Sequence, residues 1–345
     1  MSSGVILTMI LNKSTLNIII DTDPGTDDAL TLGVAAAFSR NNIRALVSTY
    51  GNVGGERTYI NLVNLAGLLE IDCDIIKGSL YPLGKNSFTP TDYHGENGLC
   101  GLELPKAPFS KELSAKLTED YNPPSLASLA PPPLKKGALQ NLYNIIKEYG
   151  NIKYIAIGPL TNIALLLDEF PDVIDYIGEL IIMGGGFDVS NMPNNTEYNF
   201  STDAEAVGKV LASPVKKVIA PLDMTHKLEF SLSEIEDITG LPPSTALTPP
   251  SEREANAVTG AVTVMAKLFY LNYYTSVRNG NGGAIIHDAN TLAYLLGKSK
   301  CVLREYKIIS DEYGAVSKNS DGYDATVIEE IDRDFVKGLL RGIFK

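Results

Sequence analysis

Four aspartates follow an apolar run near the start of the chain. Asp21, Asp23, Asp27 and Asp28 fall within "DTDPGTDD", directly after "NIII". Like charges this close repel, so a fold keeps them together only if something offsets the repulsion. A helix N-terminus could offset it. A Pro-Gly turn would place Asp27 and Asp28 in the first helical turn, where the helix dipole favours carboxylates.

A hard divalent cation offers stronger compensation. Ca²⁺ binds carboxylate, carbonyl and water oxygens, and Asp21 and Asp23 are two residues apart, so at a strand end they point to the same side. Zinc is disfavoured because the cysteines are not clustered and the histidines are not paired. By itself the turn also fits a phosphotransferase that uses Asp21 as nucleophile with Mg²⁺.

Composition restricts the partners of the protein. The chain has 345 residues, 44% of them hydrophobic, and a formal net charge of -12, which argues against nucleic acid binding because phosphate contacts need a Lys/Arg surface. Three isolated cysteines, Cys73, Cys100 and Cys301, indicate a reducing compartment. No segment reaches the roughly 20 apolar residues of a membrane-spanning helix. We expect a soluble, cytoplasmic protein without membrane or nucleic acid partners.

Short apolar runs alternate with helical patterns and end in polar or Gly-rich turns. The runs lack strict alternation, which favours strands buried on both faces. The pattern predicts an α/β fold, an open and mostly parallel sheet with helices on both faces and a site at the carboxyl ends of the strands. The runs are "LNIIID", "IRALVS", "DCDIIKGS", "IKYIAIGP", "ELIIMGGG" and "KKVIAP", and the predicted helices cover 28–39, 56–69, 161–167 and 203–211.

The chain shows no repeat and no clear domain boundary. We expect a flexible N-terminus over 1–15 and one α/β domain over 16–345. The stretch 105–133 contains "NPPSLASLAPPP" and is predicted to be a Pro-rich excursion from that domain. A long helix is expected through "VTGAVTVMAKLFYLNYYTSV".

An ordered set of motifs carries a family resemblance. After the acidic turn come "YGNVGG", "YHGENGL", "AIGPLTNIA", "IIMGGG", "EYNFSTDAEA", "PLDMT" and "IIHDANTLAY". Together they resemble the nucleoside hydrolases of the inosine–uridine-preferring type. The resemblance implies one tightly bound Ca²⁺ and hydrolysis of the N-glycosidic bond of a ribonucleoside, uridine or inosine, to ribose and free base in nucleoside salvage. It also implies a homodimer or homotetramer.

The same resemblance implies the cation ligands. Ile157 stands where the family often has Thr, and a backbone carbonyl ligand does not require that side chain. Asp21 is expected to support the loop by hydrogen bonding. The implied ligands are Asp23, Asp28, the carbonyl of Ile157, and Asp288.

Further positions match the sugar-binding residues of the family. Asn194 and Asn195 remain alternatives to Asn191, because "NMPNNTEYN" diverges from the family pattern. The implied ribose contacts are Asp27, Asn52, Met183, Asn191, Glu197 and Asn199.

The chemistry needs a base and an acid. Asp23 is expected to accept the proton of the attacking water. His287 matches the leaving-group position and is the expected general acid or a member of a proton relay, and His94 matches a pocket position. Tyr273 and Tyr274 line the base pocket, join that relay or simply pack the helix. With no Trp in the chain, base stacking on an indole is excluded.

Two other classes of function compete with this interpretation. The phosphotransferase needs a downstream Lys and a second acidic pair, for which "PLDMTHK" is a poor substitute. A Ca²⁺-stabilised protein that binds nucleosides without catalysis has no motif in its favour, because Asp23, Asp28 and Asp288 are all present. Ribose release separates the three.

Overall fold

The computed structural model describes residues 16–84, 93–106, 136–247 and 257–345. The predicted flexible segment 1–15 and nearly all of the predicted excursion 105–133 lie outside the described residues. Among the helices of the described ranges, none has the length and apolar character required to cross a membrane.

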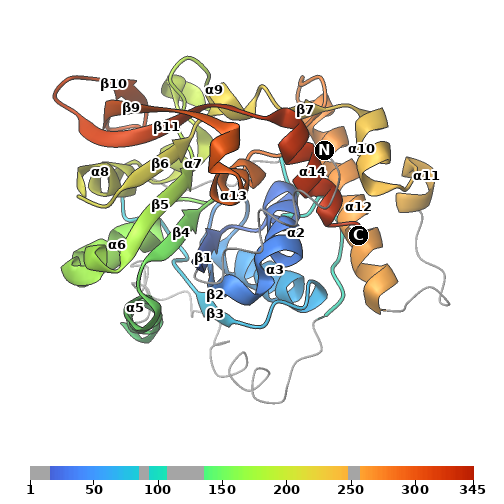
Figure 1. Cartoon of the computed structure of the whole chain (residues 1–345), viewed down its shortest axis with the longest axis horizontal. Helices are drawn as coiled ribbons and strands as arrows, with labels where there is room; N and C mark the ends of the chain where they lie inside the picture. The colour runs from blue at the N-terminus through green and yellow to red at the C-terminus, as the bar shows by residue number, and fades with distance from the viewer. Residues whose placement is uncertain (1–15, 85–92, 107–135, 248–256) are drawn as a thin grey trace, which may run out of the picture.

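A nine-stranded sheet runs through the described part of the molecule (Figure 1). Its order is β10-β9-β11-β6-β5-β4-β1-β2-β3, and every pair from β11 to β3 is parallel, whereas β9 is antiparallel to both of its neighbours. The predicted open, mostly parallel sheet is confirmed. The strands are β1 (Asn17–Thr22), β2 (Ile43–Ser48), β3 (Asp74–Lys77), β4 (Ile152–Ala156), β5 (Ile177–Met183), β6 (Lys217–Ala220), β9 (Cys301–Ser310), β10 (Val316–Lys318) and β11 (Tyr323–Ile331).

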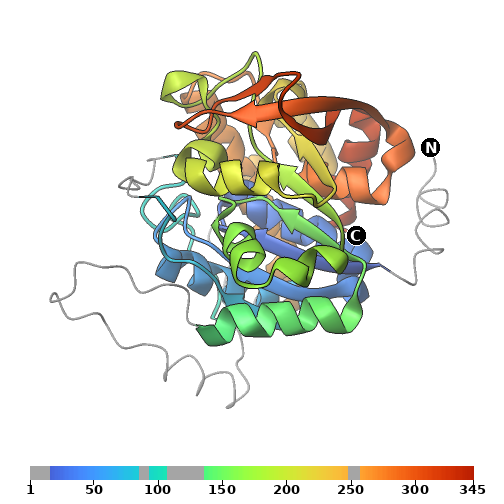
Figure 2. The same cartoon turned by 90° about the vertical axis from the view of Figure 1, so that its left-hand side faces the viewer.

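Helices cover both faces of the sheet. On one face α2 packs against α12, α13 and α14; on the other lie α5, α6 and α8, the layer that faces the viewer in Figure 2. A separate two-stranded sheet joins β7 (Glu229–Phe230) to β8 (Ala284–Ile285). The α-helices are α2 (Thr26–Ser39), α3 (Gly55–Leu68), α5 (Lys136–Tyr149), α6 (Thr161–Glu169), α7 (Tyr198–Thr202), α8 (Ala204–Ala212), α9 (Leu222–Thr225), α10 (Leu232–Thr239), α11 (Pro243–Ala246), α12 (Ala257–Arg278), α13 (Ala289–Leu296) and α14 (Arg333–Gly342). Short 3₁₀ turns are η1 (Arg40–Asn42), η2 (Pro171–Asp175), η3 (Pro193–Asn195) and η4 (Lys298–Lys300).

Strand β1 shows why the apolar runs lack alternation. Ile18 and Ile20 belong to the hydrophobic core under α2, and Ile19 belongs to the core on the opposite face. All three side chains are fully buried. A strand that is covered on both faces needs apolar residues at every position, which is the pattern seen in the sequence.

The strand order reverses beside β1. The chain runs outward from β1 to β2 and β3, and then continues from β4 on the other side to β5 and β6. In open α/β sheets such a reversal leaves a crevice at the carboxyl ends of the strands, where ligands bind. The acidic turn that follows β1 lies at this crevice.

Asn162, in the first turn of α6, ties three strand ends together at this reversal. Its Nδ2 donates to Asp21 Oδ1 at 2.8 Å and to the Ser48 carbonyl at 3.0 Å, and its Oδ1 accepts from the Ser79 amide at 2.7 Å. Tyr154 also donates to Asp21, at 2.8 Å. The expected role of Asp21 in supporting the loop agrees with these contacts.

Asn162→Ala removes these three hydrogen bonds and leaves buried partners without them. We expect it to lower the free energy of unfolding by about 2–4 kcal/mol, measured by urea denaturation. Asn144→Ala, on the exposed surface of α5, is the matched control and should change stability by less than about 0.5 kcal/mol. Equal small effects of the two variants would contradict the role assigned to Asn162.

Candidate active site

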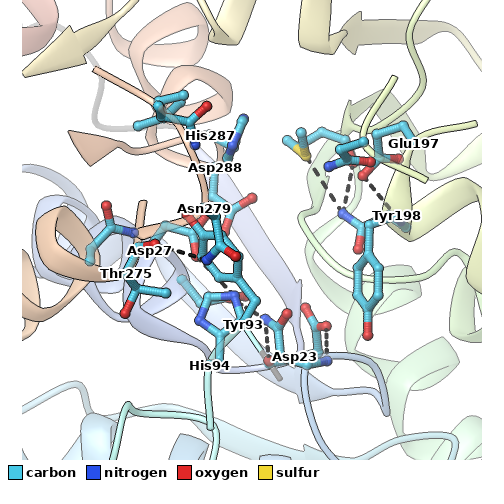
Figure 3. Close-up of a pocket in the computed structure, with 18 of the residues that line it drawn as sticks. Asp23, Asp27, Tyr93, His94, Glu197, Tyr198, Thr275, Asn279, His287 and Asp288 are labelled. Carbon is cyan, nitrogen blue, oxygen red and sulfur yellow. Dashed lines mark hydrogen bonds and ion pairs between the residues drawn. The ribbon is translucent and has the colours of Figure 1, made fainter. Parts of the chain in front are cut away.

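An open cavity of about 1190 Å³ lies at the carboxyl edge of the sheet. Residues at or just beyond the ends of four strands line it: Asp23 after β1, Asn52 after β2, Ile157 after β4 and Met183 at the end of β5. Figure 3 shows Asp27, His287 and Asp288 on one side of the cavity and Glu197 and Tyr198 on the other. The structure thus brings segments distant in sequence to one site.

Asp28 lies in the first turn of α2 and lines the cavity. Its Oδ1 accepts from Thr22 Oγ1 at 2.5 Å, and its Oδ2 accepts from the Gly25 amide at 2.9 Å and from Asn52 Nδ2 at 3.1 Å. Gly25 is the N-cap, so the helix begins at Thr26, two residues before the predicted start. These donors offset part of the cost of burying the carboxylate.

Asp23 is held between two glycines. The Asn52 amide donates to Oδ2 at 2.7 Å, and a Cβ built on Gly51 would lie 1.8 Å from that oxygen. A Cβ on Gly158 would lie 2.7 Å from Oδ1. Only residues without a side chain fit at these two positions, and they fix the place of the Asp23 carboxylate.

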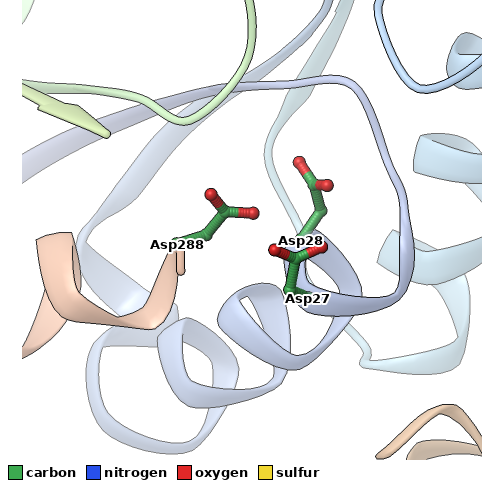
Figure 4. Close-up of side chains that lie close together, drawn as sticks. All are labelled: Asp27, Asp28 and Asp288. Carbon is green, nitrogen blue, oxygen red and sulfur yellow. The ribbon is translucent and has the colours of Figure 1, made fainter. Parts of the chain in front are cut away.

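Three carboxylates converge from two ends of the described chain. Asp27, Asp28 and Asp288 are buried, and each offers an oxygen within 4.8 Å of the others (Figure 4). Asp288 follows β8 and begins α13 without using its side chain as a cap. Asp27, predicted as a ribose contact, belongs to this group, whereas the predicted ligand Asp23 lies outside it.

Electrostatics at this cluster are unfavourable without a counter-ion. Burial, followed by the charge of Asp28, raises the pKa of Asp27 to about 8. Burial and the charges of Asp27 and Asp28 raise the pKa of Asp288 well above its ordinary value. His94 Nε2 lies 4.0 Å from Asp27 Oδ1, but burial lowers the pKa of His94 to about 4, so it is neutral at pH 7.

The donor set suits a hard divalent cation. Carboxylate oxygens alone form the cluster, and the carbonyl of Ile157, which accepts from Asn199 Nδ2 at 3.1 Å, is also at the cavity. Oxygen donors of this kind are the ligands that Ca²⁺ prefers, and a cation would offset the repulsion that raises the pKa values. The residues present therefore fit such an ion.

Glu197 and Asn199, which were predicted as ribose contacts, lie on the opposite wall of the cavity. Glu197 is the N-cap of α7, and its carboxylate accepts from the amides of Gly185, Asn199 and Phe200 at 2.8–3.1 Å. Burial raises its pKa to about 7. Asn199 Nδ2 also donates to the Met183 carbonyl at 3.3 Å, which connects this wall to the end of β5.

All three histidines line the cavity. His287 Nδ1 lies 2.8 Å from Thr225 Oγ1, and its ring centroid lies 5.3 Å from that of His226. Burial, then the nearby His226 and His94, lowers the pKa of His287 to about 3. His287 is therefore a neutral imidazole at pH 7, which can donate a hydrogen bond from one ring nitrogen.

Position bears on two open choices of residue. Asn191, Asn194 and Asn195 are all exposed, but only Asn191 lines the cavity. Asn194 and Asn195 have left-handed φ values of 62° and 57°. Tyr274 also lines the cavity, at 44% exposure. Tyr273 instead packs against the hydrophobic core, which corrects its predicted place in the base pocket, because neighbouring helix residues point about 100° apart.

Tyr198 and Asn272 are among the cavity residues that were not predicted. Tyr198 stands between Glu197 and Asn199, and its hydroxyl donates to the Gly51 carbonyl at 2.8 Å. Asn272 on α12 donates to Thr26 Oγ1 at 3.1 Å and so links that helix to the acidic turn. The position of Tyr198 inside "EYN" was the available sequence signal for it; Asn272 had none beyond its place in the helix.

Asp21 does not line the cavity, because Tyr154 and Asn162 hold both of its oxygens in the interior. A nucleophile must reach its substrate. This position argues against the phosphotransferase interpretation.

Comparisons with known proteins agree with one another. A family model described as "Inosine-uridine preferring nucleoside hydrolase" matches residues 18–337. The chain is 30% identical over 344 residues to the pyrimidine-specific ribonucleoside hydrolase RihA of Escherichia coli O1:K1 / APEC, covering 94% of this chain and 97% of that protein. To RihA of Salmonella typhimurium (strain LT2) it is 30% identical over 285 residues, covering 81% and 79%.

Solved structures share the fold. A purine-preferring ribonucleoside hydrolase from Gardnerella vaginalis superimposes with a TM-score of 0.74 at 20% identity, covering 95% of this chain and 98% of that one. An inosine-uridine preferring nucleoside hydrolase from Bacillus anthracis gives 0.67 at 16% identity, covering 95% and 99%.

Removing divalent cations tests the carboxylate cluster. Folded-state pKa values above the ordinary 3.8 mean that the cation-free folded protein binds more protons than the unfolded chain. Its stability is therefore highest below pH 3.8 as far as these groups contribute, and falls as the pH rises toward about 8. We expect EDTA to lower the Tm at pH 8 more than at pH 5, and CaCl₂ to restore it.

Asp288→Asn should abolish most of that Ca²⁺ response in differential scanning fluorimetry. Asp324→Asn, at an exposed carboxylate on β11, is the matched control and should retain it. A response that persists unchanged in Asp288→Asn would show that the cation binds elsewhere.

Proposed function

Because the chain belongs to the inosine-uridine preferring nucleoside hydrolase family, we propose that it hydrolyses pyrimidine ribonucleosides, uridine above all, with Ca²⁺ as cofactor. Ribonucleoside hydrolysis itself follows from membership of the family. The observation that carries the finer proposal is the group of buried carboxylates of Asp27, Asp28 and Asp288, which faces Glu197 and Asn199 across one cavity.

The two walls suit a sugar. Carboxyl oxygens accept hydrogen bonds and ribose hydroxyls donate them, so Asp27 and Glu197 supply acceptors on opposite sides of the cavity. Asn52, Asn191 and Asn199 add amide groups that both donate and accept. Asp27 is the most accessible carboxylate of the cluster, at 8% exposure, which fits a role at the boundary between cation and sugar.

The cation would be held by Asp28 and Asp288, with Asp23 and the Ile157 carbonyl completing the proposed set. When bound, Ca²⁺ supplies a Lewis acid that offsets the carboxylate charge, attracts the ribose diol and lowers the pKa of water. Asp27 lies close enough to share in this binding. The assignments of Asp28 and Asp288 rest on the carboxylate geometry, and those of Asp23 and the Ile157 carbonyl rest on the family resemblance of the motifs.

Asp23 is the proposed base. Its Oδ2 accepts from the Asn52 amide, which leaves Oδ1 to take the proton of the attacking water. As the glycosidic bond lengthens, positive charge develops on the sugar, as in other glycoside cleavage. The carboxylates of Asp27 and Glu197 favour that charge because they are buried and close to the bound sugar.

His287 is the proposed partner of the leaving base. When the Thr225 hydroxyl donates to Nδ1, the proton of the neutral ring is on Nε2, which can donate to the departing pyrimidine. His226 lies next to it and can pass a proton along. A proton relay through these two rings therefore fits the low pKa of His287 better than direct transfer from an imidazolium.

The names of the relatives support the proposed base preference. The RihA proteins at 30% identity are named as pyrimidine-specific, and the purine-preferring structural neighbour stands at 20% identity, a level that supports the fold alone. Tyr274 is the proposed aromatic residue beside the base. Three unpaired cysteines fit the proposed cytoplasmic location, and a homodimer or homotetramer remains a prediction.

A nucleoside panel tests the activity. We expect purified protein with Ca²⁺ to release ribose from uridine and cytidine, at a kcat/KM at least about tenfold above that for inosine, in a reducing-sugar assay. EDTA should stop the release. A protein that binds uridine in calorimetry but never releases ribose would be a binding protein and would refute the proposal.

Substitutions separate the roles of the base and the acid. Asp23→Ala and Asp288→Ala should abolish turnover and weaken metal retention in elemental analysis. His287→Ala should lower kcat by about 10²–10⁴-fold while ribose still binds, since the histidine acts on the base. Loss of ribose binding in His287→Ala would contradict this role, and Asp324→Asn serves as the unaffected control.

A further inference from the structure

The peptide unit between Gly51 and Asn52 is held at both ends. Its N–H, from Asn52, donates to Asp23 Oδ2 at 2.7 Å. Its carbonyl, from Gly51, accepts from the hydroxyl of Tyr198 at 2.8 Å. The same peptide plane therefore lies between the proposed base on one side and an aromatic residue of the opposite wall on the other.

The Asp23 carboxylate packs against this peptide plane. The space where a Gly51 side chain would begin is filled by the Asp23 carboxylate, since a Cβ there would lie 1.8 Å from Oδ2. Rotation of the plane would replace the N–H by the Gly51 carbonyl and set two oxygens against each other. The direction of the plane thus decides whether Asp23 keeps its orientation.

Gly51 makes such a rotation easy in the absence of a restraint. Glycine has access to more backbone conformations than any other residue, and the packing of Asp23 excludes a side chain here. The next restraint along the chain is the Gly51 amide, which donates to the Val53 carbonyl at 3.1 Å and closes a tight turn. The Tyr198 hydroxyl restrains the carbonyl end from 147 residues away.

Tyr198 belongs to the proposed sugar-binding wall. It follows Glu197, the N-cap of α7, and precedes Asn199, which donates to the Ile157 carbonyl. Its ring lines the cavity opposite Asp27 and Asp288 (Figure 3). A peptide carbonyl that accepts a hydrogen bond polarises the peptide unit and strengthens donation from its N–H. The Tyr198 hydroxyl therefore strengthens the hydrogen bond from the Asn52 N–H to Asp23.

We propose that Tyr198 is a positioning residue whose hydroxyl locks the Gly51–Asn52 peptide and thereby holds Asp23 in its reactive orientation. This inference rests on the proposed function for the chemistry of Asp23. It assigns to Tyr198 no contact with the reacting atoms. The sugar-binding wall and the proposed base are then coupled through this hydroxyl.

Tyr198→Phe isolates the hydroxyl, because the ring and its packing remain. With uridine at saturating Ca²⁺, we expect kcat to fall by about 10- to 100-fold and KM to change by less than about threefold, since misplacement of a reacting group costs rate rather than ground-state binding. A kcat equal to that of the wild type would overturn the proposal. So would a raised KM with unchanged kcat, which would show that the hydroxyl binds substrate.

Tyr270→Phe is the matched control. Tyr270 donates its hydroxyl to the Leu241 carbonyl at 2.5 Å and is buried on α12 away from the cavity. Its loss removes the same kind of hydrogen bond. We expect a lower Tm with kcat and KM within about twofold of the wild type. If kcat fell as much in Tyr270→Phe as in Tyr198→Phe, the loss of activity would reflect lower overall stability, and the proposal would be overturned.

Amide hydrogen exchange supplies a readout that does not depend on activity. In mass spectrometry of the Ca²⁺-loaded protein, the peptic fragment with Asn52 should exchange about fivefold faster in Tyr198→Phe than in the wild type or Tyr270→Phe. Unchanged exchange would refute the lock. If the wild type releases no ribose while exchange rises as expected, the proposed function fails and the lock stands.

Discussion

The structure depends on burying several carboxylates at one point. Asp28 and Asp288 come from opposite ends of the described chain, and Coulomb repulsion between such groups is large where water is excluded. Two features oppose this repulsion. Thr22, Gly25 and Asn52 donate hydrogen bonds to the oxygens of Asp28. Oxygens of Asp27 and Asp288 lie close enough to those of Asp28 to share one cation. A site with this charge has little use other than binding a cation and stabilising positive charge on a ligand.

The sheet supplies the place for this cluster. Its order reverses between β1 and β4, so the loops after these strands diverge and leave room at the carboxyl edge. Below this space, Asn162 joins the strand ends by hydrogen bonds to Asp21, Ser48 and Ser79. The charge cluster therefore lies on a rigid base of buried hydrogen bonds, which is what a preorganised site needs.

Sequence reasoning succeeded where the determinants are local. Apolar runs identified the parallel strands, and polar residues at the strand ends identified part of the cavity. It failed where the outcome depends on side-chain direction. Tyr273 and Tyr274 are neighbours on α12, yet Tyr273 packs against the core and only Tyr274 lines the cavity. The contact of Tyr198 with Gly51 depends on the pairing of segments 147 residues apart, which no local pattern encodes.

The small β7–β8 sheet has a consequence for how such enzymes diversify. The chain leaves this sheet at Phe230 and returns to it at Ala284, a few residues before Asp288. The segment between these points carries α10, α11 and α12, and the C-terminal part of α12 lines the cavity. Changes there alter the cavity wall while the return point stays fixed. A lineage can thus evolve a new choice of nucleobase without rebuilding the machinery that breaks the bond.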